Sequence, residues 1–372
     1  MRDVVVVGGG PVGLAAAIAA AQGGLTTTVI DVREPPIDKA CGEGLMPAGV
    51  DALEQLGIDL DTLHGRPFCG IRYVDRDAAG RYVAADGSFA GRPGLGIRRT
   101  ALHNALAERA GRLGVELRWR TKATGLTAGG VETHGGTLRS RVVVGADGLH
   151  SRVRRWSGLY AGPGPRRRYG VRRHFAVRPW CESVEIVWSE GAEAYVTPVG
   201  ENEVGVALLV EDAGAVFEER LSAFPELAES LLGAKPTSRD RGAGPFWQKT
   251  RGVVAGHVAL IGDASGYLDP ITGEGLGLGF RQALALADAI ALGDLAAYTR
   301  AHARILAPHV RLTSWLLRLQ RRPAIRRRAI GALARTPDLF SRILAAHNGE
   351  LPWRAVPGRE VGKFARALVA AR

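Results

Sequence analysis

Three glycines near the start of the chain, Gly8, Gly10 and Gly13, have a spacing that suits the binding of a dinucleotide. Valines precede them and an alanine-rich run follows, so they lie between a predicted buried strand and a predicted helix. The first glycine permits a tight turn, the second lets the backbone approach a pyrophosphate, and the third lets helix and strand pack closely. The helix N-terminus then presents free N–H groups to the phosphates.

The opening stretch, residues 4–21, carries no charge, so a membrane or export segment is an alternative explanation. Its glycines and Pro11 would break a spanning helix in the middle, which favours the nucleotide interpretation. A second strand is predicted over residues 26–30, and it ends at Asp31, about 20 residues beyond the first glycine. A carboxylate there can accept hydrogen bonds from the ribose hydroxyls of an adenosine, and it would repel a 2′-phosphate.

A second glycine-bearing segment lies at residues 257–280, with the sequence HVALIGDASGYLDPITGEGLGLGF. A predicted strand over 258–261 leads to Asp263, and a loop with several glycines then precedes a long alanine-rich helix. An aspartate at a strand end, followed by another glycine-bearing helix N-terminus, predicts a second anchor on one extended ligand.

The second segment resembles the GD box of FAD-dependent oxidoreductases related to p-hydroxybenzoate hydroxylase and geranylgeranyl reductase. The stretch VVVGADGLHSRVRR, residues 142–155, resembles the DG box of the same superfamily, and Arg99-x-x-Leu102 resembles its arginine helix. All four motifs occur in the family's order. The resemblance implies a flavoprotein of the group A monooxygenase type, with an α/β fold: a discontinuous Rossmann-like FAD domain of the glutathione-reductase type, an inserted β-sheet substrate domain and a helical C-terminus.

The resemblance also implies where FAD would lie. The glycine turn would hold the pyrophosphate, Asp31 the adenosine ribose, Arg99 the phosphate or ribitol side, and Asp263 the ribitol. Asp147 would serve FAD and the nicotinamide donor, although a plain helix cap at a strand-to-turn junction is an alternative for it. The isoalloxazine would be lined by a set of residues around the second helix N-terminus: Pro270, Gly273, Gly275 and Leu276. Backbone N–H groups there would stabilise negative charge on the reduced flavin.

Because the motifs are spread along the chain, the FAD domain is predicted to be discontinuous, over 1–70, 98–158 and 251–300. The substrate domain would comprise 71–97 and 159–250, where residues 183–188 and 204–210 have the pattern of sheet strands. The remainder, 301–372, is predicted to be helical. Five prolines are expected to break it: Pro308, Pro323, Pro337, Pro352 and Pro357.

The segment KACGEGLMP, residues 39–47, resembles the reductase-like branch of the superfamily, in which its cysteine lies near the flavin ring. Cys41 could therefore tune the flavin or touch substrate, or it could be a small buried apolar residue. Glu43 is a candidate proton carrier or substrate contact, and a solvated loop carboxylate is the alternative. His174, with the arginines before it, could meet an acidic substrate or a nucleotide phosphate, or could belong to an exposed strand face.

Three kinds of flavin chemistry remain open. A monooxygenase would use molecular oxygen and a flavin hydroperoxide to hydroxylate or epoxidise a small hydrophobic or aromatic metabolite. A reductase of isoprenoid double bonds would carry a YxWxFP segment, but this chain has Glu193, Tyr195 and Thr197 at the aromatic positions, which predicts a more polar pocket. The third is modification of a residue in a partner protein. The monooxygenase is the first expectation, with Tyr195 near its substrate; the halogenase branch lacks support because its WxWxIP motif is absent.

Only one strand–glycine turn–helix unit is present, so no separate nicotinamide-binding Rossmann domain is expected. NADH or NADPH would visit transiently, or a separate reductase would supply electrons. Three widely spaced cysteines argue against a disulfide framework and against zinc, so no metal is expected and a cytoplasmic location fits best.

The formal net charge of +12 arises mainly from arginine. Two basic runs, 166–173 and 318–328, lack the spacing of nucleic-acid-binding motifs, so nucleic acid is not an expected partner. The second run could form a basic helix at a membrane surface. A solvated helix face is the preferred interpretation, and membrane contact is not expected.

Overall fold

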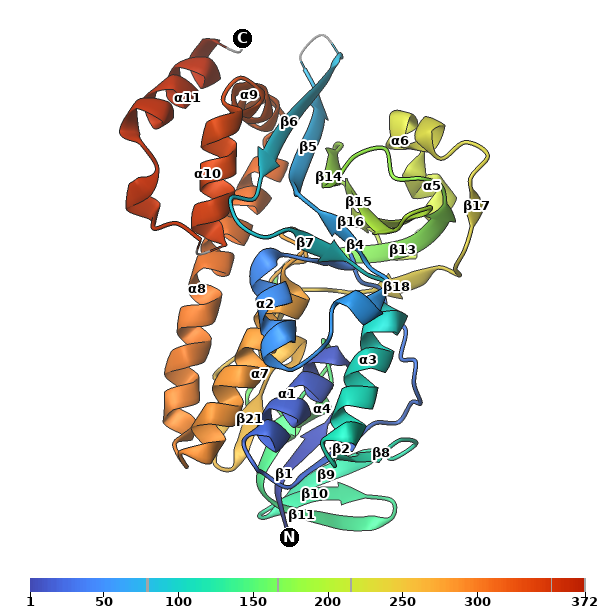
Figure 1. The fold of residues 1–372 in the computed structure, drawn as a ribbon, viewed down its shortest axis with the longest axis vertical. Coiled ribbons are helices and arrows are strands. Elements are labelled where there is room, and N and C mark those ends of the chain that lie inside the picture. The colour runs from blue at the N-terminus through green and yellow to red at the C-terminus, as the bar shows by residue number, and fades with distance from the viewer. Residues whose placement is uncertain (78–79, 166, 215, 349, 371–372) are drawn as a thin grey trace.

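We describe the fold from a computed structural model, which places residues 1–77, 80–165, 167–214, 216–348 and 350–370. A mostly parallel sheet covered by helices lies at the end that holds the N-terminus, and a mostly antiparallel sheet lies at the opposite end (Figure 1). C-terminal helices run along one side of both sheets (Figure 1). This is the α/β architecture with a helical C-terminus that the sequence predicted.

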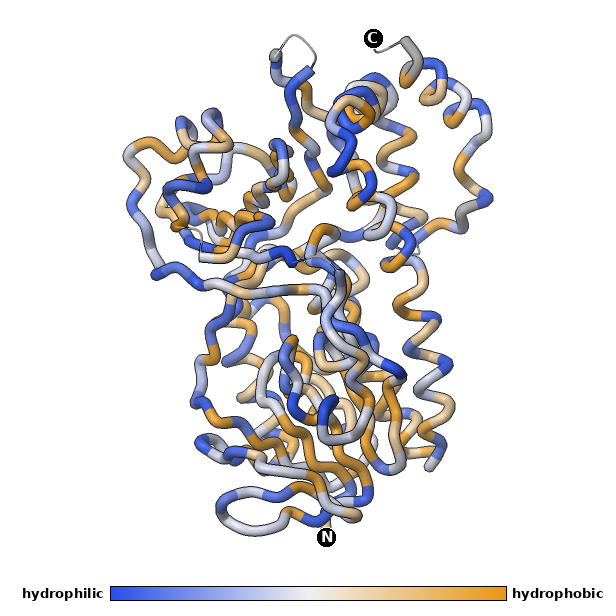
Figure 2. The backbone as a smooth tube through the Cα atoms, turned by 180° about the vertical axis from the view of Figure 1, so that it is seen from behind, coloured by the Kyte–Doolittle hydropathy of each residue, from blue (hydrophilic) through white to orange (hydrophobic). Residues whose placement is uncertain are grey.

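The first sheet has the strand order β20-β21-β11-β1-β2-β8, and β9 and β10 extend it as a meander on β11. The strands of its centre pair in parallel, with Val5 opposite both Val143 and Thr28. These central strands are covered on both faces, which explains their continuous valine runs, and Figure 2 shows them as a hydrophobic band above the N-terminus. The strands are β1 (Arg2–Val7), β2 (Thr27–Ile30), β8 (Glu116–Arg118), β9 (Ala123–Thr127), β10 (Gly130–Thr133), β11 (Gly136–Gly145), β20 (Val254–Ala255) and β21 (Val258–Leu260).

Helices α1 and α7 of this part pack closely because glycines face their neighbours. A Cβ at Gly279 would lie 2.4 Å from the Val12 side chain, and one at Gly277 would lie 3.1 Å from the Gly49 Cα. Helix α7, which follows the GD segment, thus rests directly on α1 and α2. The helices of this part are α1 (Pro11–Gln22), α2 (Pro47–Gln55), α3 (Arg99–Arg112), α4 (Arg152–Trp156) and α7 (Gly275–Ala291), with 3-10 turns η1 (Asp61–Leu63) and η2 (Gly262–Ser265).

The second sheet has the order β17-β13-β16-β15-β14-β5-β6, and β18 also pairs with β13. Adjacent strands in this sheet run antiparallel, except for β14 and β5, which run parallel. Strands that precede helix α3 and strands that follow it therefore meet in one sheet. The residue bounds of the domains stay a prediction. The strands are β5 (Gly70–Arg76), β6 (Tyr82–Ser88), β13 (Tyr169–Ala176), β14 (Ser183–Trp188), β15 (Glu193–Gly200), β16 (Glu203–Val210), β17 (Lys235–Pro236) and β18 (Arg241–Ala243).

The two faces of this sheet have different roles because successive side chains alternate. Val196 and Val206 point to an apolar core beneath α5 (Phe217–Leu221) and α6 (Pro225–Ser230). Tyr195 points the other way, toward the first part and the C-terminal helices. Two small sheets complete the fold: β3 (Gly44–Leu45), β4 (Arg66–Phe68) and β7 (Gly94–Gly96) form one, and β12 (Tyr160–Pro163) and β19 (Gln248–Thr250) the other.

The C-terminal region is helical, but one expected break is wrong: α8 (Leu295–Gln320) continues through Pro308. Pro323 and Pro337 instead begin the next two helices, where a missing N–H is tolerated. Among the described residues, no helix is long and apolar enough to cross a membrane. The further helices are α9 (Pro323–Ala334), α10 (Pro337–His347) and α11 (Gly358–Ala370), with the 3-10 turn η3 (Trp353–Ala355).

The basic run 318–328 is not a uniformly solvated face. Arg318 and Arg328 are exposed, but Arg326 is 1% exposed and forms an ion pair of 2.7 Å with the buried Asp75. Its guanidinium also lies over the Trp188 ring. The run therefore contributes a buried charge to the contact between α9 and the second sheet.

Candidate active site

The glycine turn between β1 and α1 is enforced partly by the protein's own packing. Gly8 has φ of +111°, and a Cβ there would lie 2.4 Å from the Ala146 carbonyl oxygen. A Cβ at Gly13 would lie 1.9 Å from the Gly8 carbonyl oxygen. Neither position can take a larger residue without moving the backbone, so both glycines shape the turn.

Gly10 differs, because a Cβ there would meet only the Arg99 Nη2, at 3.7 Å. Gly10 caps α1, which has Pro11 in its first turn and receives no side-chain cap. The N–H groups of the first turn therefore face open space beside Gly10. This space, with a guanidinium at its edge, fits the pyrophosphate of a dinucleotide.

Asp31 lies beside this turn, and its contact with the adenosine ribose stays a prediction. Its Oδ2 accepts a hydrogen bond of 2.7 Å from the Gly9 N–H, and its Oδ1 accepts one of 2.8 Å from the Arg33 N–H. Sequence reasoning missed a second anchor, His103, whose Nε2 lies 2.8 Å from the Gly9 carbonyl oxygen. Burial lowers the pKa of His103, so the neutral ring donates this bond and ties α3 to the turn.

Asp147 behaves as the cap that was the alternative interpretation. Its Oδ2 accepts hydrogen bonds from the backbone N–H groups of Arg152, at 2.6 Å, and Val153, at 3.1 Å. The buried Arg154, on the helix that Asp147 caps, donates to the carbonyl oxygens of Asp263 and Ala264, both at 3.0 Å. The DG and GD segments are thus fixed to each other, and a direct contact of Asp147 with a cofactor stays a prediction.

The Asp263 carboxylate remains available as an acceptor. No residue in the described part of the chain donates a hydrogen bond to it, and burial raises its pKa while Lys39 and Arg99 lower it. Sequence reasoning also missed Lys39 as a site residue. Its Nζ lies 3.5 Å from where a Cβ of Gly148 would stand, and Asp31 and Asp263 are both close enough to affect its pKa.

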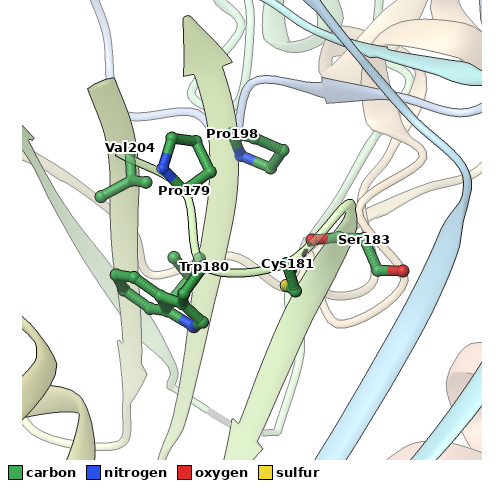
Figure 3. A pocket seen from close by; sticks show the side chains of 7 residues that line it. Pro179, Trp180, Cys181, Ser183, Pro198 and Val204 are labelled. Atoms are coloured by element: carbon green, nitrogen blue, oxygen red, sulfur yellow. Dashed lines mark hydrogen bonds between the residues drawn. The ribbon is translucent and has the colours of Figure 1, made fainter. Parts of the chain in front are cut away.

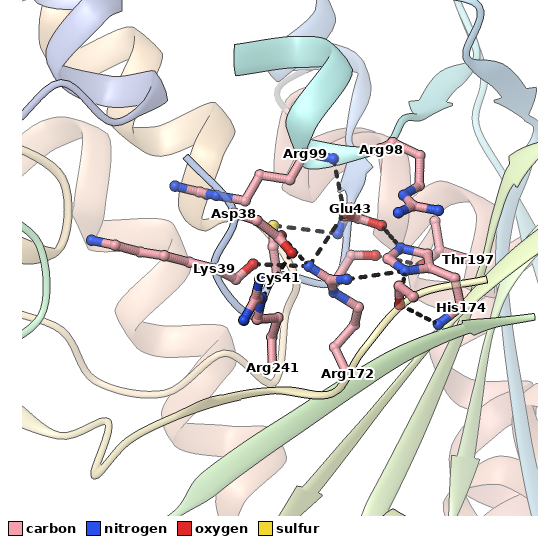
Figure 4. Close-up of polar contacts among 12 residues, drawn as sticks. Asp38, Lys39, Cys41, Glu43, Arg98, Arg99, Arg172, His174, Thr197 and Arg241 are labelled. Carbon is pink, nitrogen blue, oxygen red and sulfur yellow. Dashed lines mark hydrogen bonds and ion pairs between the residues drawn. The ribbon is translucent and has the colours of Figure 1, made fainter. Parts of the chain in front are cut away.

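Lys39 and Arg99 together supply positive charge to this region. The surrounding protein partly desolvates the Lys39 ammonium, which lowers its pKa although the residue as a whole is exposed. Repulsion from Arg99 lowers the pKa further. Figure 4 shows the two side chains extending in the same direction, away from His174. Two cations between the glycine turn and the GD segment suit a doubly anionic pyrophosphate.

The predicted isoalloxazine segment forms an accessible turn before α7. Gly273, with φ of +70°, donates a 2.8 Å backbone bond to the Pro270 carbonyl oxygen, and α7 begins at Gly275. The helix has no side-chain cap, and its first-turn residues Gly275 and Leu276 are half-buried. Its N–H groups can therefore stabilise negative charge on a ligand placed there.

This turn is held from two sides. Asp269 forms a 2.7 Å ion pair with the buried Arg168. The Tyr195 hydroxyl donates a 2.7 Å hydrogen bond to the Ile271 carbonyl oxygen. From the C-terminal helices, His309 and His347 contact the Glu274 carboxylate at 3.1 and 2.9 Å. The Tyr195 hydroxyl is thus engaged with the backbone, and its predicted part in catalysis stays a prediction.

Glu43 is 3% exposed and has φ of +60°, so its interpretation as a solvated loop carboxylate is wrong. Its Oε1 accepts a 2.8 Å bond from the Arg99 N–H, and its Oε2 contacts His174 Nε2 (Figure 4). Gly205 lies beside this contact, where a Cβ would be 3.3 Å from the His174 ring and 3.4 Å from Glu43 Oε2. The Cys41 Sγ accepts a 3.4 Å bond from the Glu43 N–H.

His174 is 0% exposed and Arg172 1%, so the exposed strand face is also wrong for them. Both point from β13 toward the segment 38–44, where Arg172 contacts Asp38 and donates to the Lys39 carbonyl oxygen. The intervening Arg173 lies on the other face and pairs with Asp240. Alternation along one strand thus separates two neighbouring arginines that look equivalent in the sequence.

A shallow surface depression lies elsewhere on the second sheet (Figure 3). Val196 and Pro198 line it, and they alternate along β15 with Thr197, whose Oγ1 donates to the Gly42 carbonyl oxygen. The depression is therefore on the face opposite to the candidate site.

The family model of the FAD binding domain matches residues 1–195, a little over half of the chain. The chain belongs to this FAD-binding family. Together with the uncapped helix ends and the open space at Gly10, this identifies the protein as an FAD-dependent oxidoreductase. The resemblance drawn from its motifs is confirmed.

The curated relatives of this FAD-dependent oxidoreductase include enzymes named for lipid substrates. A digeranylgeranylglycerophospholipid reductase of Methanothermobacter thermautotrophicus is 29% identical over 321 residues, covering 79% of each chain. A menaquinone reductase of Mycolicibacterium smegmatis is 29% identical over 336 residues, 82% of this chain and 80% of the relative. A second digeranylgeranylglycerophospholipid reductase, from Methanococcoides burtonii, is 31% identical over 74% of this chain and 71% of its own.

Solved structures share the fold over nearly the whole chain. The flavin-dependent brominase Bmp2 superposes with a TM-score of 0.81 at 18% identity, covering 99% of this chain and 98% of its own. The 2-methyl-3-hydroxypyridine-5-carboxylic acid oxygenase has a TM-score of 0.67 at 21% identity, covering 100% and 98%. At these identities the likeness establishes the fold and does not choose between halogenase, oxygenase and reductase chemistry.

Proposed function

We propose that this protein reduces carbon–carbon double bonds of an isoprenoid chain, with FAD as its redox cofactor. The observation that carries the proposal is the placement of Cys41 and Glu43 between the predicted cofactor region and the second sheet. Reduction of a double bond adds a hydride to one carbon and a proton to the other. FAD supplies the hydride when it is bound and reduced, so the chain must supply the proton.

The Cys41 thiol is suited to that task. Burial raises its pKa and the nearby Glu43 carboxylate raises it further, so the group stays a thiol at neutral pH. The electrostatic influence of Cys41 extends to Tyr267, whose hydroxyl lies 3.6 Å from where a Cβ of Gly275 would stand. This supports a position of the thiol toward the α7 N-terminus, where the isoalloxazine is predicted to lie.

At the positions where a YxWxFP segment has its aromatic residues, this chain has Glu193, Tyr195 and Thr197, which predicted a more polar pocket for a prenyl chain. In the structure Thr197 and Tyr195 donate to backbone carbonyl oxygens, and Glu193 pairs with the buried Arg168. Because these polar groups are engaged inside the protein, they do not argue against an apolar substrate. The curated relatives, named for digeranylgeranylglycerophospholipids and menaquinone, support the same alternative over the monooxygenase.

The test is anaerobic turnover of the FAD-loaded protein with NADH, NADPH or dithionite as reductant. Digeranylgeranylglycerophospholipid and menaquinone are offered as substrates, and products are read by mass spectrometry. We expect a mass gain of two hydrogens per double bond without oxygen. Products that form only in air and carry label from molecular oxygen would restore the monooxygenase, and no small-molecule product under either condition would turn attention to a partner protein.

A matched pair of variants locates the proton donor. Cys41→Ser should retain FAD but lose most reductase turnover, because a serine hydroxyl is a much weaker acid than a thiol. Cys69→Ser, at an exposed free cysteine, should behave as the parent protein. Full activity of Cys41→Ser would remove Cys41 from the reaction.

A further inference from the structure

The outer face of helix α8 carries a row of exposed arginines with a tryptophan among them. Residues three, four or seven positions apart lie on one face of a helix, and four exposed residues of α8 have this spacing. They are Arg304, Arg311, Trp315 and Arg318, which we call the basic stripe. At 1.5 Å per residue the stripe is about 21 Å long, and α8 runs along the outer edge of the molecule (Figure 1).

The charge of the basic stripe is not neutralised within the protein. The sequence has ten arginines and no aspartate or glutamate between Asp294 and Asp338. Among the described residues, no carboxylate pairs with an arginine of the stripe. The carboxylates that reach this segment bind other arginines: Asp294 pairs with Arg300, Asp75 with Arg326 and Glu190 with Arg327. The stripe therefore leaves three guanidinium groups available to an external anion.

Apolar side chains lie among these charges. Trp315 is 47% exposed, and Val310 on the same helix and Ile325 on α9 are exposed to a similar degree. An indole has an apolar body and a polar N–H, which suits the boundary between lipid headgroups and acyl chains. Neighbouring arginines can bury their aliphatic stems there while each guanidinium stays among the phosphates. This mixture is typical of a helix at a membrane interface, whereas the core of a protein–protein interface is depleted of charge.

The opposite face of α8 belongs to the interior and to the candidate active site. His309 contacts Glu274 at the start of α7, and Leu316 packs in the core that includes Tyr195. The arginines of the stripe take no part in these contacts. One helix thus separates the basic stripe from the predicted flavin turn.

We propose that the basic stripe binds the surface of an anionic phospholipid bilayer. Phosphodiester headgroups supply the negative charge that the stripe lacks inside the protein, and Trp315 enters the headgroup region. A solvated face was the preferred interpretation of the run 318–328; the structure adds that unpaired arginines share one face with an exposed tryptophan. The proposal goes beyond the proposed function, because it concerns where the protein meets lipid, and its test needs no turnover.

The first test is sedimentation of the FAD-loaded protein with vesicles of mixed phosphatidylglycerol and phosphatidylcholine, and with vesicles of phosphatidylcholine alone. We expect at least roughly 10-fold stronger binding to the anionic vesicles at low salt. The difference should shrink as salt rises, because exposed charges are screened within about 10 Å at 0.1 M. Equal binding to both kinds of vesicle, or binding to neither, would overturn the proposal.

Charge reversal locates the surface. The double variant Arg311→Glu with Arg318→Glu should weaken binding to anionic vesicles by at least about 100-fold, because each arginine near such a surface contributes roughly fivefold. The matched control, Arg112→Glu with Arg139→Glu, reverses two exposed arginines on α3 and β11 and should stay much closer to the parent. Both variants should retain FAD and the parental melting temperature. Equal losses of binding in the two would overturn the assignment to the stripe.

Contact of Trp315 with lipid is read by fluorescence quenching in anionic vesicles whose acyl chains carry bromine. Part of the parent's tryptophan fluorescence should be quenched, and Trp315→Ser should lose that part. Trp180→Ser, at a similarly exposed tryptophan beside the second sheet, should keep it. Binding without quenching, or tighter binding of polyglutamate than of anionic vesicles at equal charge, would indicate an acidic protein as the partner and would overturn the proposal.

The docking surface and the proposed function can fail separately. A protein that binds vesicles through the stripe but reduces neither prenyl substrate would overturn the proposed function and keep the docking surface. A protein that reduces a prenyl substrate dispersed in detergent, but does not sediment with anionic vesicles, would overturn the docking surface and keep the reductase.

Discussion

At the scale of single residues, buried arginines decide much of this structure. Arg154, Arg168, Arg172 and Arg326 are each at most 3% exposed. Each guanidinium binds groups from distant segments, and its planar set of donors allows several such bonds at once. The arginines, which the sequence analysis treated as a net charge and two basic runs, therefore also hold segments of the fold together.

The ion pair between Arg326 and Asp75 gives the first prediction. Arg326→Met should lower the free energy of unfolding by about 3–5 kcal/mol, because it leaves a buried carboxylate without its cation. Arg327→Met is the matched control: its partner Glu190 is largely exposed, so the loss should stay below about 1 kcal/mol. Urea denaturation of both variants measures this, and equal losses would contradict the burial argument.

Lys39 gives the second prediction. Lys39→Met should weaken FAD binding roughly 10- to 100-fold, the range expected for losing a hydrogen bond to a charged group. Lys39→Arg should retain most of the affinity, and Lys122→Met, at an exposed site in the strand-rich edge, should have no effect. Quenching of flavin fluorescence reads the dissociation constant, and unchanged binding by Lys39→Met would exclude the lysine from the cofactor site.

At the scale of elements, the turn between β1 and α1 combines two kinds of glycine. Gly8 and Gly13 are required by neighbouring backbone, whereas Gly10 borders open space. The sequence motif treats the three alike because it records only spacing. The structure separates the residues that build the turn from the one that leaves room for a ligand.

This distinction gives the third prediction. Gly13→Ala should destabilise the protein even without FAD by about 1–3 kcal/mol or more, because its Cβ would overlap the Gly8 carbonyl oxygen. Gly10→Glu should leave the apoprotein as stable as the parent but abolish the stabilisation by FAD, about 2.7 kcal/mol at 100 times the dissociation constant. Thermal unfolding with and without FAD checks both; similar apoprotein losses in the two variants would refute the assignment.

At the scale of the whole molecule, the C-terminal helices are tied to the cofactor segment. Tyr298 of α8 donates to the Leu260 carbonyl oxygen at 2.7 Å, and His302 lies 2.9 Å from Ser265 Oγ. Further along the same helix, His309 contacts Glu274 at the start of α7. One helix thus follows the GD segment from its strand to the predicted flavin turn (Figure 1).

Glu274 gives the fourth prediction. Its hydrogen bonds to His309 and His347 lower its pKa to about 2 despite burial, compared with an ordinary value of 4.5. Below pH 4.5 the Glu274 carboxyl binds a proton in the unfolded chain but not yet in the folded one. The stability that the ionised carboxylate contributes is therefore fully present above about pH 4.5 and is lost as the pH falls toward 2. It amounts to about 3 kcal/mol at most.

The variant Glu274→Gln should therefore be less stable at neutral pH and show a flatter acid limb between pH 4.5 and 2. Urea unfolding across this range measures the slope. A parental slope in Glu274→Gln would show that the two histidines do not hold this carboxylate ionised.

The sequence by itself determined the cofactor class and the two strand–helix units that are predicted to hold it. Motifs such as Gly8-x-Gly10-x-x-Gly13 are local: one turn needs those residues at that spacing, whatever the rest of the chain does. The strands of the second sheet were also visible, because Ser183–Trp188 and its neighbours alternate or run apolar. The helical C-terminus was predicted too, although Pro308 was wrongly expected to end a helix.

Tertiary structure alone decided which polar residues meet. Glu43 and His174 lie 131 positions apart, and their contact depends on β13 facing the loop 38–44 across Gly205. Arg172 and Arg173 are neighbours in the chain, yet strand alternation sends one to the candidate site and the other to Asp240. Burial and partnership of charges depend on contacts between distant segments, and no local pattern in the sequence encodes them.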